Sequence, residues 1–455
     1  MSALTRAALG GAEPAPVRIV HLGLGAFHRA HQAWYTARAS DAAEWGIAAF
    51  TGRGPTAALE LAPQNGLYSL VERSDTGDSV SVVRSIVEAH DGADVARLVE
   101  LLASPSTAIV TITVTEAGYR LSADGTPDLS DDAVAADMAG FATGRAQTTL
   151  GRLLLGLDAR RRAGTGPLAV VPCDNMPDNG EVVGTAVTAL AAAVDPALAA
   201  WIGDNVSFVS TSVDRITPKT TPDDLATVAR LGGWHDAAAV VTEPFSDWVL
   251  SGDFPAGRPD WESAGARFVD EIGPFESRKL WLLNGAHSLL AYTARQRGHE
   301  TVAAAIGDPA CLAAVEAFWD AAVRHLPAAG LELPAYRAAL LDRFRNARIE
   351  HRLAQIANDG STKLRIRIAP IVLAERASGR SGAAGVAVIA GWISQLLPGG
   401  VLASGELTDP LAESLRSAAL LPAVEAVPAL LELVHPALAA DAEVVARVLG
   451  SVSAA

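Results

Sequence analysis

The sequence has little cysteine: Cys173 and Cys311 are too few for a disulfide framework or a cysteine-based zinc cluster, and they suit a reducing compartment. Charged residues make up only 19% of the chain and hydrophobic residues 50%, which excludes disorder and allows a large buried core. The N-terminal 16 residues lack the apolar core of a signal peptide. The longest apolar stretch, 383–397, is interrupted by glycine and polar residues and predicts a buried helix rather than a membrane span. We therefore expect a cytoplasmic protein with no membrane partner.

An excess of basic residues is also absent. The net charge is −15 and the isoelectric point about 5.1. A polyphosphate backbone would be repelled on average, so we expect no nucleic-acid partner. The length of 455 residues is enough for two or three domains.

The first half of the chain alternates apolar, β-branched runs with helical patterns. A helix is expected over about 30–38, and the expected strands are 17–22, 45–50, 79–87, 107–115, 168–171 and 206–213. Strands that alternate with helices predict a parallel sheet covered on both faces.

The second half changes character near Pro274, after which alanine- and leucine-rich helical patterns dominate. Helices are expected over 279–297, 311–325, 336–356 and 411–420. The predicted fold is an α/β, Rossmann-like dinucleotide-binding domain over residues 1–274, followed by a mostly α-helical substrate-binding and catalytic domain over residues 275–455.

The sequence Gly23-Leu24-Gly25 lies between a predicted strand and a predicted helix, where a dinucleotide fold places its pyrophosphate turn. Glycine permits the tight turn and close backbone approach, and the helix start supplies amide donors. His28 replaces the third glycine of the motif, and Arg29 could pair with a phosphate. The alternative is an ordinary strand–turn–helix.

An acidic residue that would bind the ribose 2′-hydroxyl is not apparent after the second strand, where Arg53 could instead contact a 2′-phosphate. We expect NAD as the cofactor and leave NADP open. His21, His28 and His31 raise the alternative of a metal site, but no cysteine or pair of carboxylates is close in sequence, so we predict no metal.

The most informative segment, residues 276–287, reads Glu-Ser-Arg-Lys-Leu-Trp-Leu-Leu-Asn-Gly-Ala-His. Burying an amine lowers its pKa toward the range of a general base, and Lys279 precedes four apolar residues. At about 100° per residue on an α-helix, Glu276, Lys279, Asn284 and His287 fall within a sector of roughly 140°. One face would then offer a base, an amide donor, an imidazole and a carboxylate. The alternative is an amphipathic helix with a solvated lysine and a structural histidine.

Polar loops follow several predicted strands. Asn175 lies after the strand 168–171 and could hold a substrate oxygen, and its neighbours Asp174 and Asn179 could instead cap backbone groups. Asp214 could orient a substrate hydroxyl or pair with Arg215. Farther along, Lys363 could bind a substrate hydroxyl or carboxylate, or lie solvated at the end of a helix.

Together these segments resemble the polyol-specific long-chain dehydrogenases, the family of mannitol dehydrogenase and fructuronate reductase. The matching stretches span most of the chain in order: 19–31, 113–119, 173–175, 213–218, 243–245, the Lys279-x4-Asn284-x2-His287 signature, and 351–363.

The resemblance implies a zinc-independent oxidoreductase with its active site between the two domains. It implies that Lys279 is the general acid/base, that Asn175 and Asn284 donate to the oxyanion, that His287 and Asp214 position substrate and lysine, that Glu276 serves a proton path and that Lys363 binds substrate. The cofactor contacts predicted are Gly23, Gly25, Phe27, Arg29, Thr115 and Glu116.

Gln355 decides the expected substrate. Eight residues before the substrate-binding lysine, mannitol 2-dehydrogenases of this family show arginine, and glutamine resembles the fructuronate reductase branch. Arg352 could serve a uronate carboxylate. Ala347 and Arg365 depart from that branch, which usually shows proline at both positions.

We therefore predict an NAD-dependent enzyme that interconverts D-fructuronate and D-mannonate, as a monomer or small homo-oligomer. The runner-up is a mannitol 2-dehydrogenase or arabinitol dehydrogenase. The alternative functions of other classes are a non-catalytic nucleotide-binding regulator and a zinc alcohol dehydrogenase.

Overall fold

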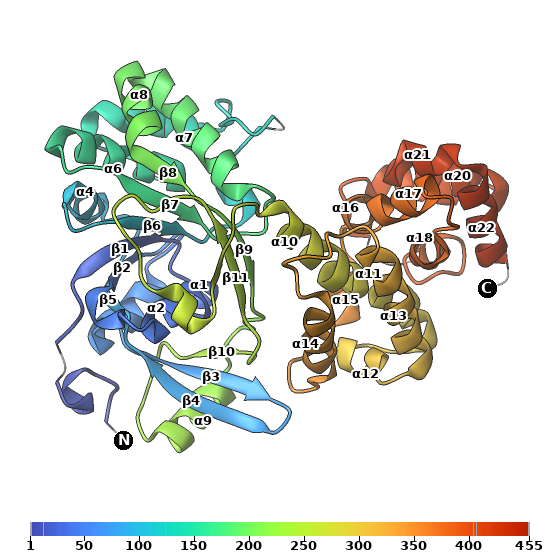
Figure 1. The fold of residues 1–455 in the computed structure, drawn as a ribbon, viewed down its shortest axis with the longest axis horizontal. Helices are drawn as coiled ribbons and strands as arrows, with labels where there is room; N and C mark the ends of the chain where they lie inside the picture. The colour runs from blue at the N-terminus through green and yellow to red at the C-terminus, as the bar shows by residue number, and fades with distance from the viewer. Residues whose placement is uncertain (1, 12, 123, 404, 406, 454–455) are drawn as a thin grey trace. The chain divides into compact units, whose positions relative to one another are not determined.

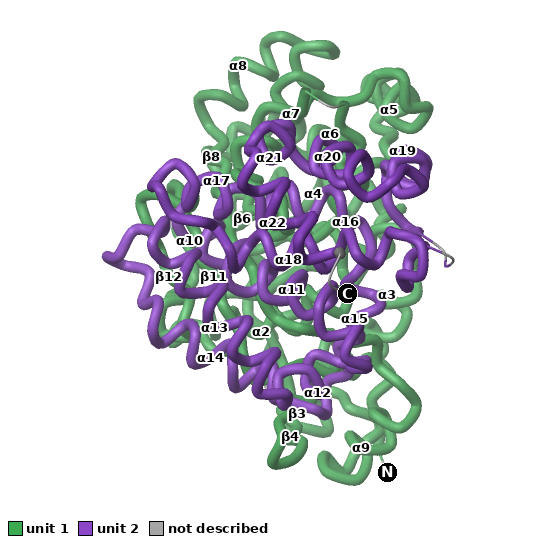
Figure 2. Tube along the Cα trace, turned by 90° about the vertical axis from the view of Figure 1, so that its right-hand side faces the viewer, with its two compact units in different colours: residues 1–273 green, residues 274–455 purple. Residues whose placement is uncertain are grey.

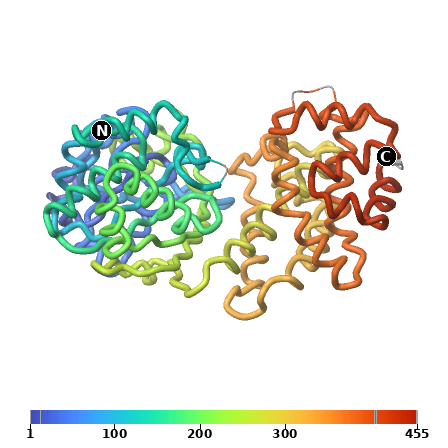
Figure 3. The backbone as a smooth tube through the Cα atoms, turned by 90° about the horizontal axis from the view of Figure 1, so that it is seen from above, coloured from blue at the N-terminus to red at the C-terminus, as the bar shows by residue number. Residues whose placement is uncertain are grey.

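A computed structural model describes residues 2–453 except 12, 123, 404 and 406. The chain divides into two compact units, residues 1–273 and residues 274–455 (Figure 2). The N-terminus belongs to unit 1 and the C-terminus to unit 2 (Figure 3). Each unit is described by itself.

Unit 1 is built on a six-stranded parallel sheet with the order β5-β2-β1-β6-β7-β8 (Figure 1). The strands are β1 (Val17–Leu22), β2 (Gly46–Phe50), β5 (Ile86–His90), β6 (Ile109–Ile112), β7 (Leu168–Pro172) and β8 (Val206–Phe208). Numbered along the chain within this sheet, the order is 3-2-1-4-5-6, the order of the dinucleotide-binding fold. The predicted Rossmann-like architecture is confirmed.

Successive strand residues point to opposite faces of the sheet and pack in two different hydrophobic cores. The sheet is therefore buried on both faces. Ile19 and Ile109 pack with the aromatic residues of the N-terminal helices, whereas Val20 and Val110 pack beneath the helices that follow β5 and β7. The helices of unit 1 are α1 (Ala26–Ala30), α2 (Gln32–Arg38), α3 (Thr56–Leu61), α4 (Val95–Ala103), α5 (Asp132–Gly140), α6 (Thr149–Ala163), α7 (Asn179–Val194), α8 (Pro196–Asn205) and α9 (Pro222–Gly232). Burial on both faces explains why the strands read as continuous apolar runs.

Two three-stranded sheets complete unit 1, with the orders β10-β3-β4 and β12-β11-β9. Their strands are β3 (Tyr68–Ser74), β4 (Gly77–Val83), β10 (Val240–Thr242), β9 (Ser210–Asp214), β11 (Asp247–Ser251) and β12 (Arg267–Phe268). Two predicted strands were wrong as single elements. The run 79–87 is divided between β4 and β5, and the run 206–213 between β8 and β9, because within each run the chain leaves one sheet and enters another.

The described residues of unit 2 form helices joined by loops, and they contain no named strand (Figure 1). Its helices are α10 (Gly273–Arg278), a π-helical segment η7 (Lys279–Asn284), α11 (Gly285–Thr293), α12 (Val302–Ile306), α13 (Pro309–Val323), α14 (Leu333–Arg345), α15 (Leu353–Ile356), α16 (Gly360–Arg367), α17 (Ala369–Ala377), α18 (Ala383–Leu396), α19 (Ala412–Ala419), α20 (Ala423–Val434), α21 (Pro436–Ala440) and α22 (Ala442–Ser453). The predicted mostly helical second part is confirmed.

Two details of unit 2 bear on the sequence predictions. The single helix expected over 336–356 is wrong, since α14 ends at Arg345 and α15 begins only at Leu353. The apolar stretch near 383–397 forms α18, most of whose residues are buried, as predicted. In the part of the chain that the structure describes, we find no helix with the length and apolar character needed to cross a membrane.

Candidate active site

The glycine turn after β1 requires glycine at its first position. Gly23 has φ +107°, and a side-chain carbon there would collide with the carbonyl of Thr113. The amides of Gly23 and Leu24 both donate to the carbonyl oxygen of Phe50, at 2.9 and 2.8 Å, which fixes the turn against β2. Gly25 is the N-cap of α1, so the first amides of that helix, including that of Phe27, lack partners within it. This arrangement fits the pyrophosphate of a dinucleotide.

The turn lies where the strand order of the sheet reverses. β1 lies between β2 and β6, and ligands of open α/β sheets bind outside the carboxyl ends of strands at such a point. Thr115 and Glu116 follow β6, and both are exposed. The Thr113 hydroxyl donates to the Gly23 carbonyl at 2.9 Å and so ties the two loops together.

Arg29 does not fit the predicted phosphate contact. Its side chain is buried, and its guanidinium donates to the carbonyls of Gly25, at 3.1 Å, and Ala238. Burial lowers the pKa of this guanidinium. Arg29 therefore joins α1 to the residues that precede strand β10, and its role is structural. The sequence motif alone could not distinguish this role from that of a phosphate ligand.

The three histidines near the turn form a buried ring cluster. The rings of His21 and His28 are stacked with centroids 3.3 Å apart, and His31 lies against Phe27 at 5.1 Å. His21 contacts the hydroxyls of Thr111 and Thr113 at 2.8 and 3.0 Å, whereas neither ring nitrogen of His28 has a hydrogen-bond partner among the described residues. Burial lowers the pKa of His21 to about 3 and that of His28 well below its usual range, so both rings are neutral near pH 7.

The loop after β7 contains two residues with structural roles, Asp174 and Asn179, and one candidate functional residue, Asn175. The Asp174 carboxylate accepts hydrogen bonds from the Tyr119 hydroxyl at 2.6 Å and the Met176 amide at 2.9 Å. Asn179 exchanges hydrogen bonds with the backbone of Thr211 at 3.1 and 2.8 Å. The capping roles expected for Asp174 and Asn179 are thus confirmed, and Asn175 lies exposed between them.

Asp214 ends strand β9, where it is buried and lies directly opposite Asp247 of β11. Arg215, the alternative partner considered for Asp214, forms an ion pair with the Glu72 carboxylate at 2.7 Å. The local sequence gives no sign of this pairing, because only the antiparallel register brings Asp247 beside Asp214.

The segment from Glu276 to His287 is helical but does not have uniform α geometry. Glu276 belongs to α10, Lys279 to Asn284 form the π-helical segment η7, and His287 belongs to α11. The prediction that these residues share a sector of about 140° assumed α-helical geometry, so it is wrong for Lys279 and Asn284. In a π-helix the hydrogen bonds join residues five apart, and Lys279 and Asn284 are separated by five positions. Lys279, Asn284 and Glu276 are partly buried, and His287 is buried.

His287 lies among positively charged groups of unit 2. Its ring packs against Phe344 at 5.0 Å and edge-on against His351 at 4.6 Å. Burial, then His351, Arg343, Arg367 and Lys363, lower the pKa of His287 well below its usual range, so the ring is neutral. Its Nε2 has no hydrogen-bond partner among the described residues.

Lys363 is part of this group and is neither solvated nor at the end of a helix. It lies in the middle of α16, partly buried, and its ammonium donates to the Ile356 carbonyl at 3.1 Å. Burial, followed by Arg367, lowers the pKa of Lys363. By contrast, Gln355 and Arg352 are exposed, and Arg352 forms a surface ion pair with Glu350 at 3.0 Å.

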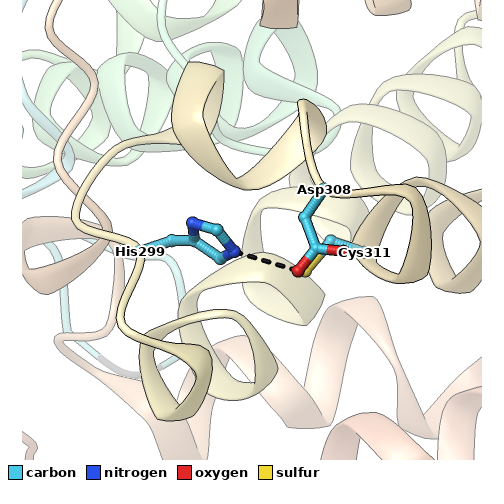
Figure 4. A group of neighbouring side chains, drawn as sticks. All are labelled: His299, Asp308 and Cys311. Carbon is cyan, nitrogen blue, oxygen red and sulfur yellow. Dashed lines mark hydrogen bonds and ion pairs between the residues drawn. The ribbon is translucent and has the colours of Figure 1, made fainter.

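One group of side chains in the described part of unit 2 has the composition of a metal site: His299, Asp308 and Cys311 (Figure 4). The Asp308 oxygen that contacts the His299 ring at 3.1 Å also contacts the Arg297 guanidinium at 2.8 Å, and the other oxygen accepts the Ala310 amide. Arg297 lowers the pKa of Asp308, and burial raises that of Cys311. A guanidinium thus neutralises the carboxylate, and the thiol favours its protonated form, both unfavourable for a metal.

Comparison with known proteins gives matches along nearly the whole chain. The mannitol dehydrogenase Rossmann domain matches residues 17–263, and the mannitol dehydrogenase C-terminal domain matches residues 271–455. D-mannonate oxidoreductase of Escherichia coli (strain K12) is 39% identical over 387 residues, 83% of this chain and 79% of the relative. Mannitol 2-dehydrogenase of Cereibacter sphaeroides is 36% identical over 355 residues, 76% and 73% of the two chains. The structure of Pseudomonas fluorescens mannitol 2-dehydrogenase in a ternary complex with NAD and D-mannitol has 33% identity and a TM-score of 0.78, covering 97% of this chain and 92% of that chain.

Proposed function

The chain belongs to the mannitol dehydrogenase family, and from that premise we propose that this oxidoreductase interconverts D-fructuronate and D-mannonate with NAD(H). The observation that carries the choice of substrate is the set of cationic side chains around His287. The charges of Arg343, Arg367 and Lys363 lower the pKa of this ring, and His351 packs against it. Such a set suits a sugar acid, whose carboxylate accepts charge-assisted hydrogen bonds, better than an uncharged polyol.

The proton transfer is assigned to Lys279. Bound nicotinamide supplies the hydride acceptor or donor. In the oxidation direction Lys279 removes the hydroxyl proton of the substrate, and in the reduction direction its ammonium returns a proton to the oxygen. The carboxamides of Asn175 and Asn284 donate to that oxygen as negative charge develops on it.

Three further residues have supporting roles in this proposal. His287 is neutral, so its ring can donate to or accept from a sugar hydroxyl without adding charge. Glu276 is the carboxylate through which protons reach the lysine, and Asp214 orients a substrate hydroxyl. Lys363 binds the carboxylate of the sugar acid.

NAD rather than NADP is the proposed cofactor. Asp91 is the first residue after β5, and its carboxylate lies 3.4 Å from the hydroxyl of Thr51, the first residue after β2. This is the region where an acidic side chain binds the ribose 2′-hydroxyl and repels a 2′-phosphate. Asp91 follows the third strand of the sheet rather than the second, so the sequence motif alone did not identify it. The P. fluorescens structure, a complex with NAD, also supports this choice.

A second candidate function is oxidation of mannitol, supported by the mannitol 2-dehydrogenase relative and by the structure that holds D-mannitol. The two candidates differ by one charge on the substrate. Their kcat/KM values should therefore be compared for D-fructuronate and D-fructose, with NADH and with NADPH. We expect kcat/KM to be at least tenfold higher for D-fructuronate with NADH. A higher value for D-fructose would replace this proposal with the polyol function, and a higher value with NADPH would overturn the cofactor assignment.

A further inference from the structure

The π-helical segment η7 begins at the proposed base, Lys279, and ends at the proposed oxyanion donor, Asn284. The amide of Gly285 donates to two carbonyls, that of Leu280, five residues earlier, and that of Leu282. In an α-helix, residues five apart are separated by about 140° around the axis. A π turn holds more residues, so the same two positions lie closer to one side of the helix.

Two side chains from other helices of unit 2 hold the carbonyls of this segment. The indole nitrogen of Trp319, on α13, donates to the Leu282 carbonyl at 2.8 Å. The guanidinium of Arg367, at the end of α16, donates to the Asn284 carbonyl at 3.3 Å. Trp319 has no exposed surface, so water does not compete for its hydrogen bond.

Packing against α13 also constrains the residue that follows the segment. A side-chain carbon on Gly285 would lie 2.7 Å from the ring of Phe318, the neighbour of Trp319. Gly285 therefore lets α13 approach closely enough for the indole to reach the Leu282 carbonyl. The π turn and α13 form one packed arrangement, fixed by a glycine, a ring contact and a buried hydrogen bond.

We infer that Trp319 is a positioning residue for the reaction: its hydrogen bond to Leu282 holds the π turn that brings Lys279 and Asn284 to one side of the helix. The inference rests on the proposed function, because it concerns the same lysine and amide. Without the indole donor the segment relaxes toward α geometry, which turns Asn284 away from Lys279. The turnover step is then impaired, while cofactor binding, assigned to unit 1, is unaffected.

The test compares Trp319→Phe with Trp261→Phe. Trp261 is a matched control, since it is fully buried in unit 1 and its indole donates to the Thr36 hydroxyl at 3.0 Å. We expect Trp319→Phe to lower kcat at least tenfold, to change KM for the sugar less than threefold, and to shift the acidic limb of the kcat–pH profile by at least half a pH unit. Trp261→Phe should leave kcat and the profile unchanged. A kcat within twofold of the parent enzyme for folded Trp319→Phe would overturn the inference.

Gly285→Ala is the second variant, used if Trp319→Phe does not fold. It should show the same loss of kcat with retained KM. Its control is Gly450→Ala in α22, where an added carbon meets nothing within 4 Å. Unchanged kcat in Gly285→Ala would overturn the inference.

Lys279→Ala, assayed in parallel, distinguishes a failure of the inference about Trp319 from a failure of the proposed mechanism. Loss of turnover in Lys279→Ala with unchanged turnover in Trp319→Phe contradicts only the role of Trp319. Retained turnover in Lys279→Ala contradicts the proposed mechanism itself.

Discussion

In unit 1 the candidate cofactor residues follow the carboxyl ends of parallel strands, whereas in unit 2 the candidate catalytic residues occupy a helix that changes from α to π geometry. The first arrangement depends on backbone: a glycine with positive φ, a fixed turn and the first amides of a short helix. The second depends on side chains and on contacts from distant helices, such as Trp319 and Arg367. A site formed by backbone groups tolerates substitutions of neighbouring side chains, whereas a site formed by side chains is sensitive to them. The comparison predicts different outcomes for substitutions in the two units.

The largest effect on ligand binding is expected for Lys363→Met, which removes one positive charge from the group around His287 in unit 2. Hydrogen bonds to charged groups contribute about 1.5–3 kcal/mol, so KM for D-fructuronate should rise by roughly 10- to 150-fold while the Kd for NADH stays constant. Steady-state kinetics and a fluorescence titration with NADH measure the two quantities.

Lys219→Met is the control for this prediction, because its side chain is exposed. This control should change KM less than twofold. An unchanged KM in Lys363→Met would remove the basis for the choice of a sugar acid.

A smaller effect, confined to cofactor binding, is expected for Gly23→Ala. Strained backbone conformations cost about 1–3 kcal/mol each, and the added carbon also collides with the Thr113 carbonyl. We expect the Kd for NADH to rise about tenfold or more. The control is Gly54→Ala, in an exposed turn with nothing within 4 Å of the added carbon. Equal affinity in both variants would show that the turn after β1 does not hold the cofactor.

The same contrast explains how much the sequence could predict. Gly23 and Gly25 and the strands around them were predictable because a glycine turn between a buried strand and a helix is a local pattern. The role of Arg29 was not, because its guanidinium is committed to the Ala238 carbonyl, more than 200 residues away in sequence.

In unit 2, Lys279, Asn284 and His287 were identifiable as candidates from their residue types. Their angular relation was not, because the π turn depends on tertiary contacts from α13 that no local propensity contains. The charges around His287 likewise come from several separate elements, including α14 and α16.

The smallest effect is a pH dependence of stability in unit 1. In the folded chain the pKa of His28 lies well below the unfolded value of about 6.5. Above pH 6.5 the ring is neutral in both states; as the pH falls below 6.5, only the unfolded chain gains the proton, so stability falls. His28→Phe should remove about 1.4 kcal/mol per pH unit of this decline between pH 6 and 5.

Urea unfolding at several pH values measures that slope. The exposed His235 supplies the control, and His235→Phe should retain the decline of the parent chain. The same slope in His28→Phe and the parent would show that His28 is accessible to protons in the folded state.

The most direct test of the account is Lys279→Ala, measured for turnover of D-fructuronate and for NADH binding in the same preparation. General acid–base catalysis contributes about 10²–10⁴-fold to rate. We expect a loss of kcat in that range with a Kd for NADH within twofold of the parent. Turnover that persists in Lys279→Ala at the rate of the parent enzyme would contradict the role of Lys279 as the general acid/base.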